Sequence, residues 1–151
     1  MITLRDITRD NIHDILALEV AADQAGFYPH SNAYSIAEAG FPADDDPVWM
    51  RAIYKDDLPV GFMMTSENPG RGEYFLWRLM IDRHHQGKGH ARQAVRLLID
   101  RLSAEQNSQV LLTSHMRGNN RVAKLFRSLG FDYTGEELAK DDLLMRLSLR
   151  P

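Results

Sequence analysis

The chain has 151 residues, no cysteine and a formal net charge of −3 at pH 7. This length is typical of one domain with an adequate core, so we expect a single domain over residues 1–151. The lack of cysteine excludes disulfides, thiolate metal sites and cysteine nucleophiles. The mildly acidic balance disfavours nucleic acid as a partner. No apolar run is long enough to span a membrane and the N-terminus lacks a signal-like stretch, so we expect a cytoplasmic protein without membrane contact.

Apolar periodicity predicts strands and helices in a mixed order. The expected strands are 2–7, 48–54, 60–65, 74–81, 110–113, 131–134 and 143–149. The expected helices are 12–18, 32–39, 91–102 and 119–129, the last of which ends at Gly130. This order predicts an α/β fold with a mixed, mostly antiparallel sheet of about seven strands and helices on both faces.

A glycine-rich turn, Gln86-Gly87-Lys88-Gly89-His90-Ala91, lies between the apolar strand and the helix that follows it. Such a turn presents backbone N–H groups to one point, and the helix dipole adds partial positive charge there. We therefore expect the turn to bind a phosphorylated cofactor.

Other glycine-rich motifs fit this turn less well. A Walker A loop ends in Gly-Lys-Ser/Thr, whereas Lys88 is followed by Gly89. A dinucleotide fingerprint would place glycine at position 92, where this chain has arginine. A connection without any ligand stays open from these residues alone.

Two motifs together resemble the GNAT superfamily of N-acetyltransferases. The spacing Gln-x-x-Gly-x-Ala over residues 86–91 is similar to the acetyl-CoA pyrophosphate loop of that superfamily. The segment 119–131, an asparagine that opens a helix ending in Leu-Gly-Phe, is similar to its second cofactor motif. Within the superfamily, segments 20–28, 80–82 and 131–136 resemble the bacterial polyamine (spermidine or spermine) acetyltransferases.

The resemblance implies an acyltransferase fold in which two central strands splay apart and hold the pantetheine arm of acetyl-CoA between them. Acetyl-CoA would be the cosubstrate. The cofactor-binding residues implied are Leu79, Met80, Ile81, Gln86, Gly87, Lys88, Gly89, His90, Ala91, Arg92, Asn119 and Phe126.

The implied reaction is transfer of an acetyl group to a primary amine of a small cationic, polyamine-like acceptor. Because the chain has no cysteine for an acyl-enzyme, direct attack in a ternary complex is favoured. A backbone N–H near Met80 is expected to stabilise the oxyanion. Two alternatives stay open, namely acetylation of a protein α-amine or lysine, and a catalytically weak acyl-CoA-binding module.

The sequence departs from the superfamily at two catalytic positions. Phe126 replaces the usual proton-donating tyrosine, for which Tyr28, Tyr54 and Tyr133 are substitutes to consider. Trp77 stands where many amine-acetylating members carry a carboxylate. We therefore take His115 as the candidate base because of its intrinsic pKa, with a chain of waters as the alternative.

The acceptor and metal expectations rest on fewer signals. Asp23, Tyr28 and Glu38 belong to the segment that covers the acceptor site in this fold, and they are the candidate substrate-binding residues. His84 and His85 are adjacent and point apart, so we expect no metal site. The superfamily often dimerises through its last strands, which leaves a homodimer as an expectation.

Overall fold

The computed structural model describes residues 1–151. One seven-stranded sheet runs through the chain in the order β1-β2-β3-β4-β5-β7-β6. The strands are β1 Ile2–Arg5, β2 Val48–Lys55, β3 Leu58–Asn68, β4 Glu73–Ile81, β5 Val110–Met116, β6 Asp132–Ala139 and β7 Asp142–Ser148. The helices are α1 Ile12–Leu16, α2 Asn32–Glu38, α3 His90–Ser103 and α4 Asn120–Ser128, with a 3₁₀ turn at Arg83–His85.

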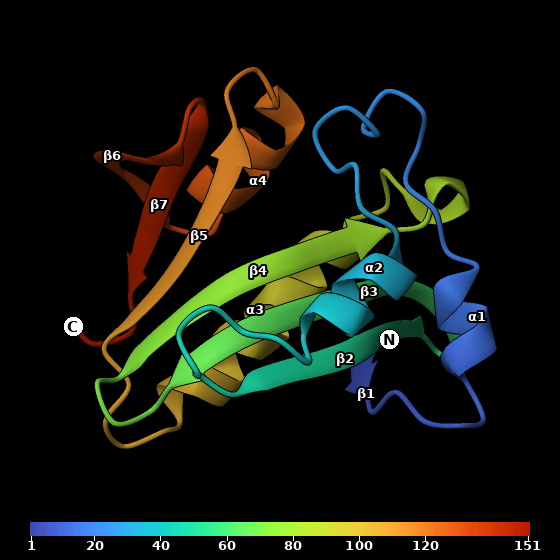
Figure 1. Cartoon of the computed structure of the whole chain (residues 1–151), viewed down its shortest axis with the longest axis horizontal. Coiled ribbons are helices and arrows are strands. Elements are labelled where there is room, and N and C mark those ends of the chain that lie inside the picture. Colours follow the sequence, from blue (N-terminus) through green and yellow to red (C-terminus); the bar gives the residue numbers. More distant parts are fainter.

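All neighbouring strands are antiparallel except β4 and β5, which run parallel. Helices α1 and α2 cover one face of the sheet, while α3 and α4 pack on the other (Figure 1). The predicted mixed sheet with helices on both faces is therefore confirmed. No helix combines the length and the apolar character needed to cross a membrane.

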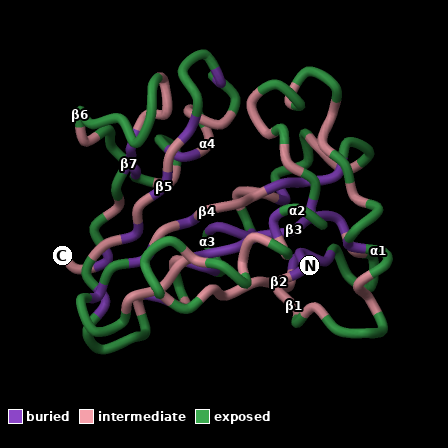
Figure 2. Tube along the Cα trace, viewed as in Figure 1, coloured by how far each residue is buried: buried purple, intermediate pink, exposed green.

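The sheet separates two apolar clusters. The larger one joins α3 and α4 to the sheet through side chains such as Leu98, Phe126 and Met145. The smaller one lies under α1 and α2 and includes Ile15, Phe62 and Met80. Buried residues follow the central strands and α3, whereas the connecting loops are mostly exposed (Figure 2).

Several element ends differ from the prediction. Helix α1 stops at Leu16, and β6 continues to Ala139 although it is mostly exposed and irregularly paired with β7. The β2–β3 connection is a tight turn at Asp56 and Asp57, and Asp56 has a φ of 52°. This short turn sets the register between β2 and β3. The pattern of apolar residues alone does not specify that register.

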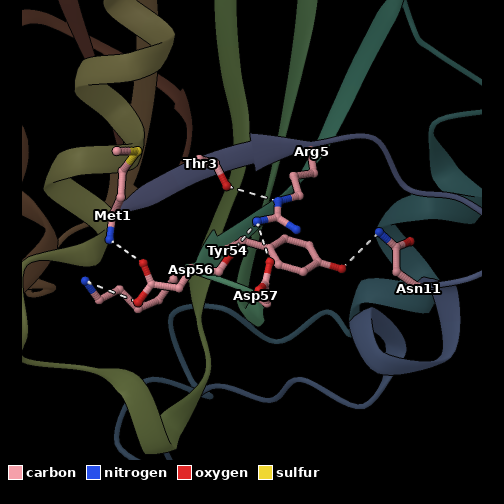
Figure 3. Close-up of polar contacts among 8 residues, drawn as sticks. Met1, Thr3, Arg5, Asn11, Tyr54, Asp56 and Asp57 are labelled. Atoms are coloured by element: carbon pink, nitrogen blue, oxygen red, sulfur yellow. Dashed lines mark hydrogen bonds and ion pairs between the residues drawn. The ribbon is translucent and has the colours of Figure 1, made fainter.

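Polar contacts fasten this turn to the first strand (Figure 3). The Met1 ammonium donates to Asp56 over 2.8 Å, and the Arg5 guanidinium contacts both the Asp56 carbonyl and the Asp57 carboxylate. The same guanidinium lies 4.2 Å from the centre of the Tyr54 ring, whose hydroxyl accepts a hydrogen bond from Asn11. These contacts hold β1 at the edge of the sheet, at a distance from the parallel strands.

The parallel pair β4–β5 separates after a short ladder. Glu73 to Leu76 pair with Val110 to Thr113, and residues 77–81 and 114–116 have no partner across the gap. Figure 1 shows the two strands diverging from their common start. This is the splay of central strands that the resemblance implied.

A bulge at Trp77 accompanies the splay. Thr65 on β3 pairs with Leu76, but the neighbouring Met64 pairs with Arg78, so Trp77 is an extra residue in β4. The side chains agree with this count, since Leu76 and Leu79, three positions apart, both pack against the larger cluster. The bulge therefore inverts the alternation of β4 in the part that faces the gap.

Candidate active site

A cavity of about 310 Å³ opens where β4 and β5 part. Its walls come from β4, the glycine-rich turn, β5, α4 and the segment that precedes α2. Leu76 and Leu79 of β4 contribute apolar walls, and the turn contributes polar groups. The cavity thus joins the two cofactor motifs, which are far apart in the sequence.

The turn leaves its backbone donors free. Gly87 and Gly89 have φ values of 75° and 80°, a conformation that favours glycine. No backbone N–H from Gly87 to Arg92 donates a hydrogen bond to another group of the chain; the first amide of α3 to do so is that of Gln93, to the Gly89 carbonyl. Unpaired N–H groups at a helix N-terminus form an anion site.

The side chains at this end add positive or neutral donors. Arg92 and Arg121 line the cavity, and no aspartate or glutamate does. The Gln86 amide donates to the Ile81 carbonyl over 2.9 Å and accepts from Arg121 over 2.9 Å, which places Arg121 beside the end of β4. The turn and these side chains therefore suit the phosphates of coenzyme A.

His90 occupies the first position of α3 and is 7% exposed. Burial lowers the pKa of its ring, and the positive side chains of Lys55 and Lys88 act in the same direction. Its Nδ1 is buried without a hydrogen-bond partner. An orphaned ring nitrogen beside the free amides is a further polar group that a ligand could satisfy.

Most of the predicted cofactor residues line this cavity. They are Leu79, Met80, Ile81, Gln86, Gly87, Gly89, His90, Ala91, Arg92, Asn119 and Phe126. The exception is Lys88, whose exposed side chain lies outside the lining. Its backbone amide still belongs to the free N–H groups of the turn.

Asn119 also caps the N-terminus of α4. Its side chain caps α4 by accepting from the Val122 N–H over 3.5 Å, and it is buried. Asn120 is the first residue of the helix and is exposed, so the cap is Asn119 and not its neighbour. Capping fixes the Asn119 side chain at the edge of the cavity.

Met80 does not present its N–H to the gap. The Asp82 N–H donates to the Val60 carbonyl over 2.8 Å, and hydrogen-bonded pairs alternate along an antiparallel ladder. Met80, opposite Phe62, therefore directs its backbone groups toward β3. The amides of Leu79 and Ile81 face the gap instead, because the bulge has shifted the alternation by one residue.

His115 lies away from the cavity. It is an interior residue of β5, not a residue after that strand, and it is 7% exposed. Its Nε2 lies 2.8 Å from the Tyr133 hydroxyl and its Nδ1 lies 2.9 Å from the Met116 carbonyl. Both ring nitrogens are occupied and the ring does not line the cavity, so the geometry gives no support to a role as base.

Two of the three predicted acceptor residues also lie outside the cavity. Glu38 is held by Arg78, whose Nη2 lies 2.8 Å from its Oε1, and this pair joins α2 to β4. Asp23 is exposed and lines no described cavity. The third residue, Tyr28, does line the cavity.

Tyr28 is the only tyrosine of the chain in the cavity wall. Burial raises the pKa of its hydroxyl to about 12, against the opposing effect of the Arg78 charge. The group therefore stays protonated near neutral pH. It is too weak an acid to give its proton readily to a thiolate, whose conjugate thiol has a pKa of about 8.5. Tyr54 and Tyr133 are engaged elsewhere, by Asn11 and His115.

Phe126 lines the cavity from α4. It is 3% exposed and its ring centre lies 5.2 Å from that of Phe131. An apolar ring at this position packs α4 on the sheet and supplies no proton.

Sequence reasoning missed two residues that shape the site. Arg121 lines the cavity, but it was not among the predicted cofactor-binding residues. Asp82 is buried, and its two oxygens accept from the N–H groups of Glu19 and His84. These contacts fasten the segment after α1 to the end of β4. The apolar run that ends in Asp82 was the available signal, because a carboxylate directly after a buried strand commonly caps a turn.

Comparisons with known proteins agree with this geometry. The profile of the acetyltransferase (GNAT) family matches residues 12–131. The spermine/spermidine N(1)-acetyltransferase of Bacillus subtilis (strain 168) is 29% identical over 141 residues, which cover 89% of this chain and 90% of that protein. The chain belongs to the GNAT family, and it is an N-acetyltransferase of that family.

Solved structures share the fold at low identity. The spermidine N-acetyltransferase of Vibrio cholerae, in complex with CoA and spermine, has a TM-score of 0.78 at 17% identity, with 98% of this chain and 95% of that chain covered. The ribosomal-protein-S18-alanine N-acetyltransferase of Escherichia coli has a TM-score of 0.72 at 14% identity, with 100% and 96% covered. These two enzymes act on different acceptors, so the fold alone does not name the amine.

Proposed function

We propose that this protein transfers the acetyl group of acetyl-CoA to a primary amine of a small, polyamine-like acceptor by direct attack in a ternary complex. The observation that carries the proposal is the cavity at the splay, where free amides of residues 87–92 adjoin unpaired backbone of β4. The acceptor class is supported by the name of the Bacillus subtilis relative.

The chain offers a binding group for each part of the cosubstrate. The amides of Gly87 to Arg92 would hold the pyrophosphate, with Arg92 and Arg121 as nearby cations. The free edge of β4 would pair with the amides of the pantetheine arm, in the way a ligand adds a strand to a sheet. Acetyl-CoA supplies the activated acyl group as a thioester.

Backbone amides that face the gap are the proposed hydrogen-bond donors to the oxyanion. The N–H of Leu79 points into the gap and would stabilise negative charge on the acyl oxygen during attack. This replaces Met80 as the donor that the sequence suggested. Phe126 cannot protonate the leaving sulfur, so water would supply that proton.

Water is also the proposed acceptor of the amine proton, because no carboxylate lines this cavity and His115 is occupied. The two histidines of the lining, His85 and His90, belong to the turn and helix start that would hold the pyrophosphate. If water accepts the proton, kcat/KM should rise with pH toward the pKa of the free amine, about 10, rather than level off near 6.5. A pH–rate profile with spermidine measures this. A plateau near 6.5 would instead indicate a histidine base.

The function is tested by an acceptor screen. Purified protein is incubated with acetyl-CoA and an amine panel (spermidine, spermine, butylamine, a peptide α-amine and a lysine peptide), and the released thiol is measured. We expect turnover with the polyamines to exceed turnover with both peptides. Preference for a peptide would establish the protein-acetylating alternative, and coenzyme A binding without any turnover would establish the binding module.

A further inference from the structure

A second cavity, of about 300 Å³, lies under the segment between α1 and α2. It shares Val20, Tyr28 and Met80 with the first cavity, so the two adjoin at these residues. The residues that only the second cavity contains include Leu16, Leu18, Glu19, Ala25 and Pro29. We call it the acceptor cavity. A linear molecule with its reacting end in the first cavity and passing these three shared residues would have its other end in the acceptor cavity.

About half of the residues that line the acceptor cavity are apolar, and the polar ones include one carboxylate and His30. Glu19 is the only acidic residue that lines either cavity. Its backbone is fixed on both sides, because its N–H donates to Asp82 over 2.9 Å and its carbonyl accepts from the Arg83 N–H over 2.8 Å. Its side chain is 69% exposed and makes only a long contact of 3.9 Å with Arg83. The backbone of Glu19 is therefore fixed, and its exposed carboxylate is available to a second cation.

Two buried oxygens at the inner end also lack partners. Asn32 is 2% exposed; its Nδ2 donates to the Ile15 carbonyl over 2.8 Å, which fixes the orientation of the amide, and its Oδ1 has no partner. The Tyr28 hydroxyl is likewise buried without one. Unpaired buried acceptors are uncommon in folded proteins, and a hydrogen-bond donor of a ligand would satisfy them.

We infer that the acceptor cavity receives the distal end of an aliphatic amine with at least two charged nitrogens, and that Glu19 selects this class by pairing with the nitrogen that does not react. The inference rests on the proposed function and names the residue that decides its substrate class. Methylene segments between the nitrogens match the apolar residues of the walls, and the positive end matches the one carboxylate.

The test compares a diamine with a monoamine of equal length. In Glu19→Gln, the KM for 1,4-diaminobutane should rise about twofold to fivefold, the upper part of the range for an exposed ion pair, whereas the KM for butylamine should not change. Asp14→Asn is the matched control, because Asp14 is exposed on neighbouring α1 and makes no hydrogen bond or ion pair. Its KM values should equal those of the unaltered protein.

A second variant tests the cavity itself. Ala25 is exposed and lines only the acceptor cavity, so Ala25→Phe should fill it without unfolding the chain and should raise the KM for spermine more than that for butylamine. The same change at exposed Ala22, which lines neither cavity, should have no effect.

The outcomes separate the two proposals. If the unaltered protein acetylates diamines but Glu19→Gln leaves their KM unchanged, this inference is overturned and the proposed function stands. If the unaltered protein acetylates no polyamine at all, the proposed function fails, and the selection by Glu19 fails with it.

Discussion

Two properties of Gly89 determine what a side chain would do at this point of the turn. Its φ of 80° favours glycine, and the space where a side chain would begin is open. In Gly89→Glu, a bulky anion would occupy that space beside the free amides, so we expect coenzyme A binding to fall below detection in titration calorimetry.

The matched control for this change is Gly135→Glu. Gly135 also has a positive φ, of 89°, with open space around it, but it belongs to β6. The control introduces the same strain and the same charge outside the cavity. Equal loss of coenzyme A affinity in both variants would show that the effect is not local to the turn.

His115 is expected to stabilise the fold rather than to move protons. In His115→Leu, two buried hydrogen bonds are lost, and the free energy of unfolding should fall by about 1–2 kcal/mol in urea titrations. The shape of the pH–rate profile should stay the same. Tyr133→Phe, which removes one of these bonds from the other side, is the comparison variant, and a new inflection in the profile of His115→Leu alone would restore the histidine as base.

The sequence could predict which residues of the two cofactor motifs lie along one cavity, whereas it could not predict the contacts of the proposed acceptor residues. The turn at 86–91 and the helix at 119–129 are local motifs, so sequence spacing determines their geometry. By contrast, Glu38 pairs with Arg78, and His115 with Tyr133, through contacts between residues 18 or more positions apart. Residue type alone cannot reveal such partners.

Gly61 on β3 leaves no room for a side chain beside β4. A Cβ at this position would collide with the Met80 carbonyl and lie 2.8 Å from Ile81 Cδ1. We expect Gly61→Ala to lower the free energy of unfolding by about 1–3 kcal/mol and to raise the KM for acetyl-CoA, since β4 must shift beside the gap. Gly26→Ala, where a Cβ meets no atom within 4 Å, is the control and should alter neither quantity beyond error.

At the scale of elements, the order of strands and helices followed from the apolar pattern, but the bulge did not. Residues 74–81 are apolar apart from Arg78, so their pattern shows no alternation that the extra residue could interrupt. Burial on both faces removes the alternation that would mark an extra residue. Consequently the sequence predicted the strand of the gap, but it could not distinguish Met80 from the neighbouring Leu79 as the residue whose amide faces the gap.

For the whole molecule, the seam that coenzyme A would bridge is a short one inside the sheet. Only four residue pairs join β4 to β5, and the two halves of the sheet part beyond them. A ligand that binds the folded state alone raises its stability by about 2.7 kcal/mol at one hundred times its Kd. We therefore expect coenzyme A to raise the melting temperature in a thermal scan, with no rise for Gly89→Glu.

The extra residue at Trp77 also limits how the length of this chain can vary. Removing it would turn the side chains of Leu79 and Ile81 to the opposite face of the sheet. The backbone groups of Arg78 and Met80 would then face the gap. An insertion among the exposed aspartates at 44–46 would disturb no strand pairing. Descendants of this sequence should therefore gain and lose residues in that loop, while the number of residues between Glu73 and Asp82 stays constant.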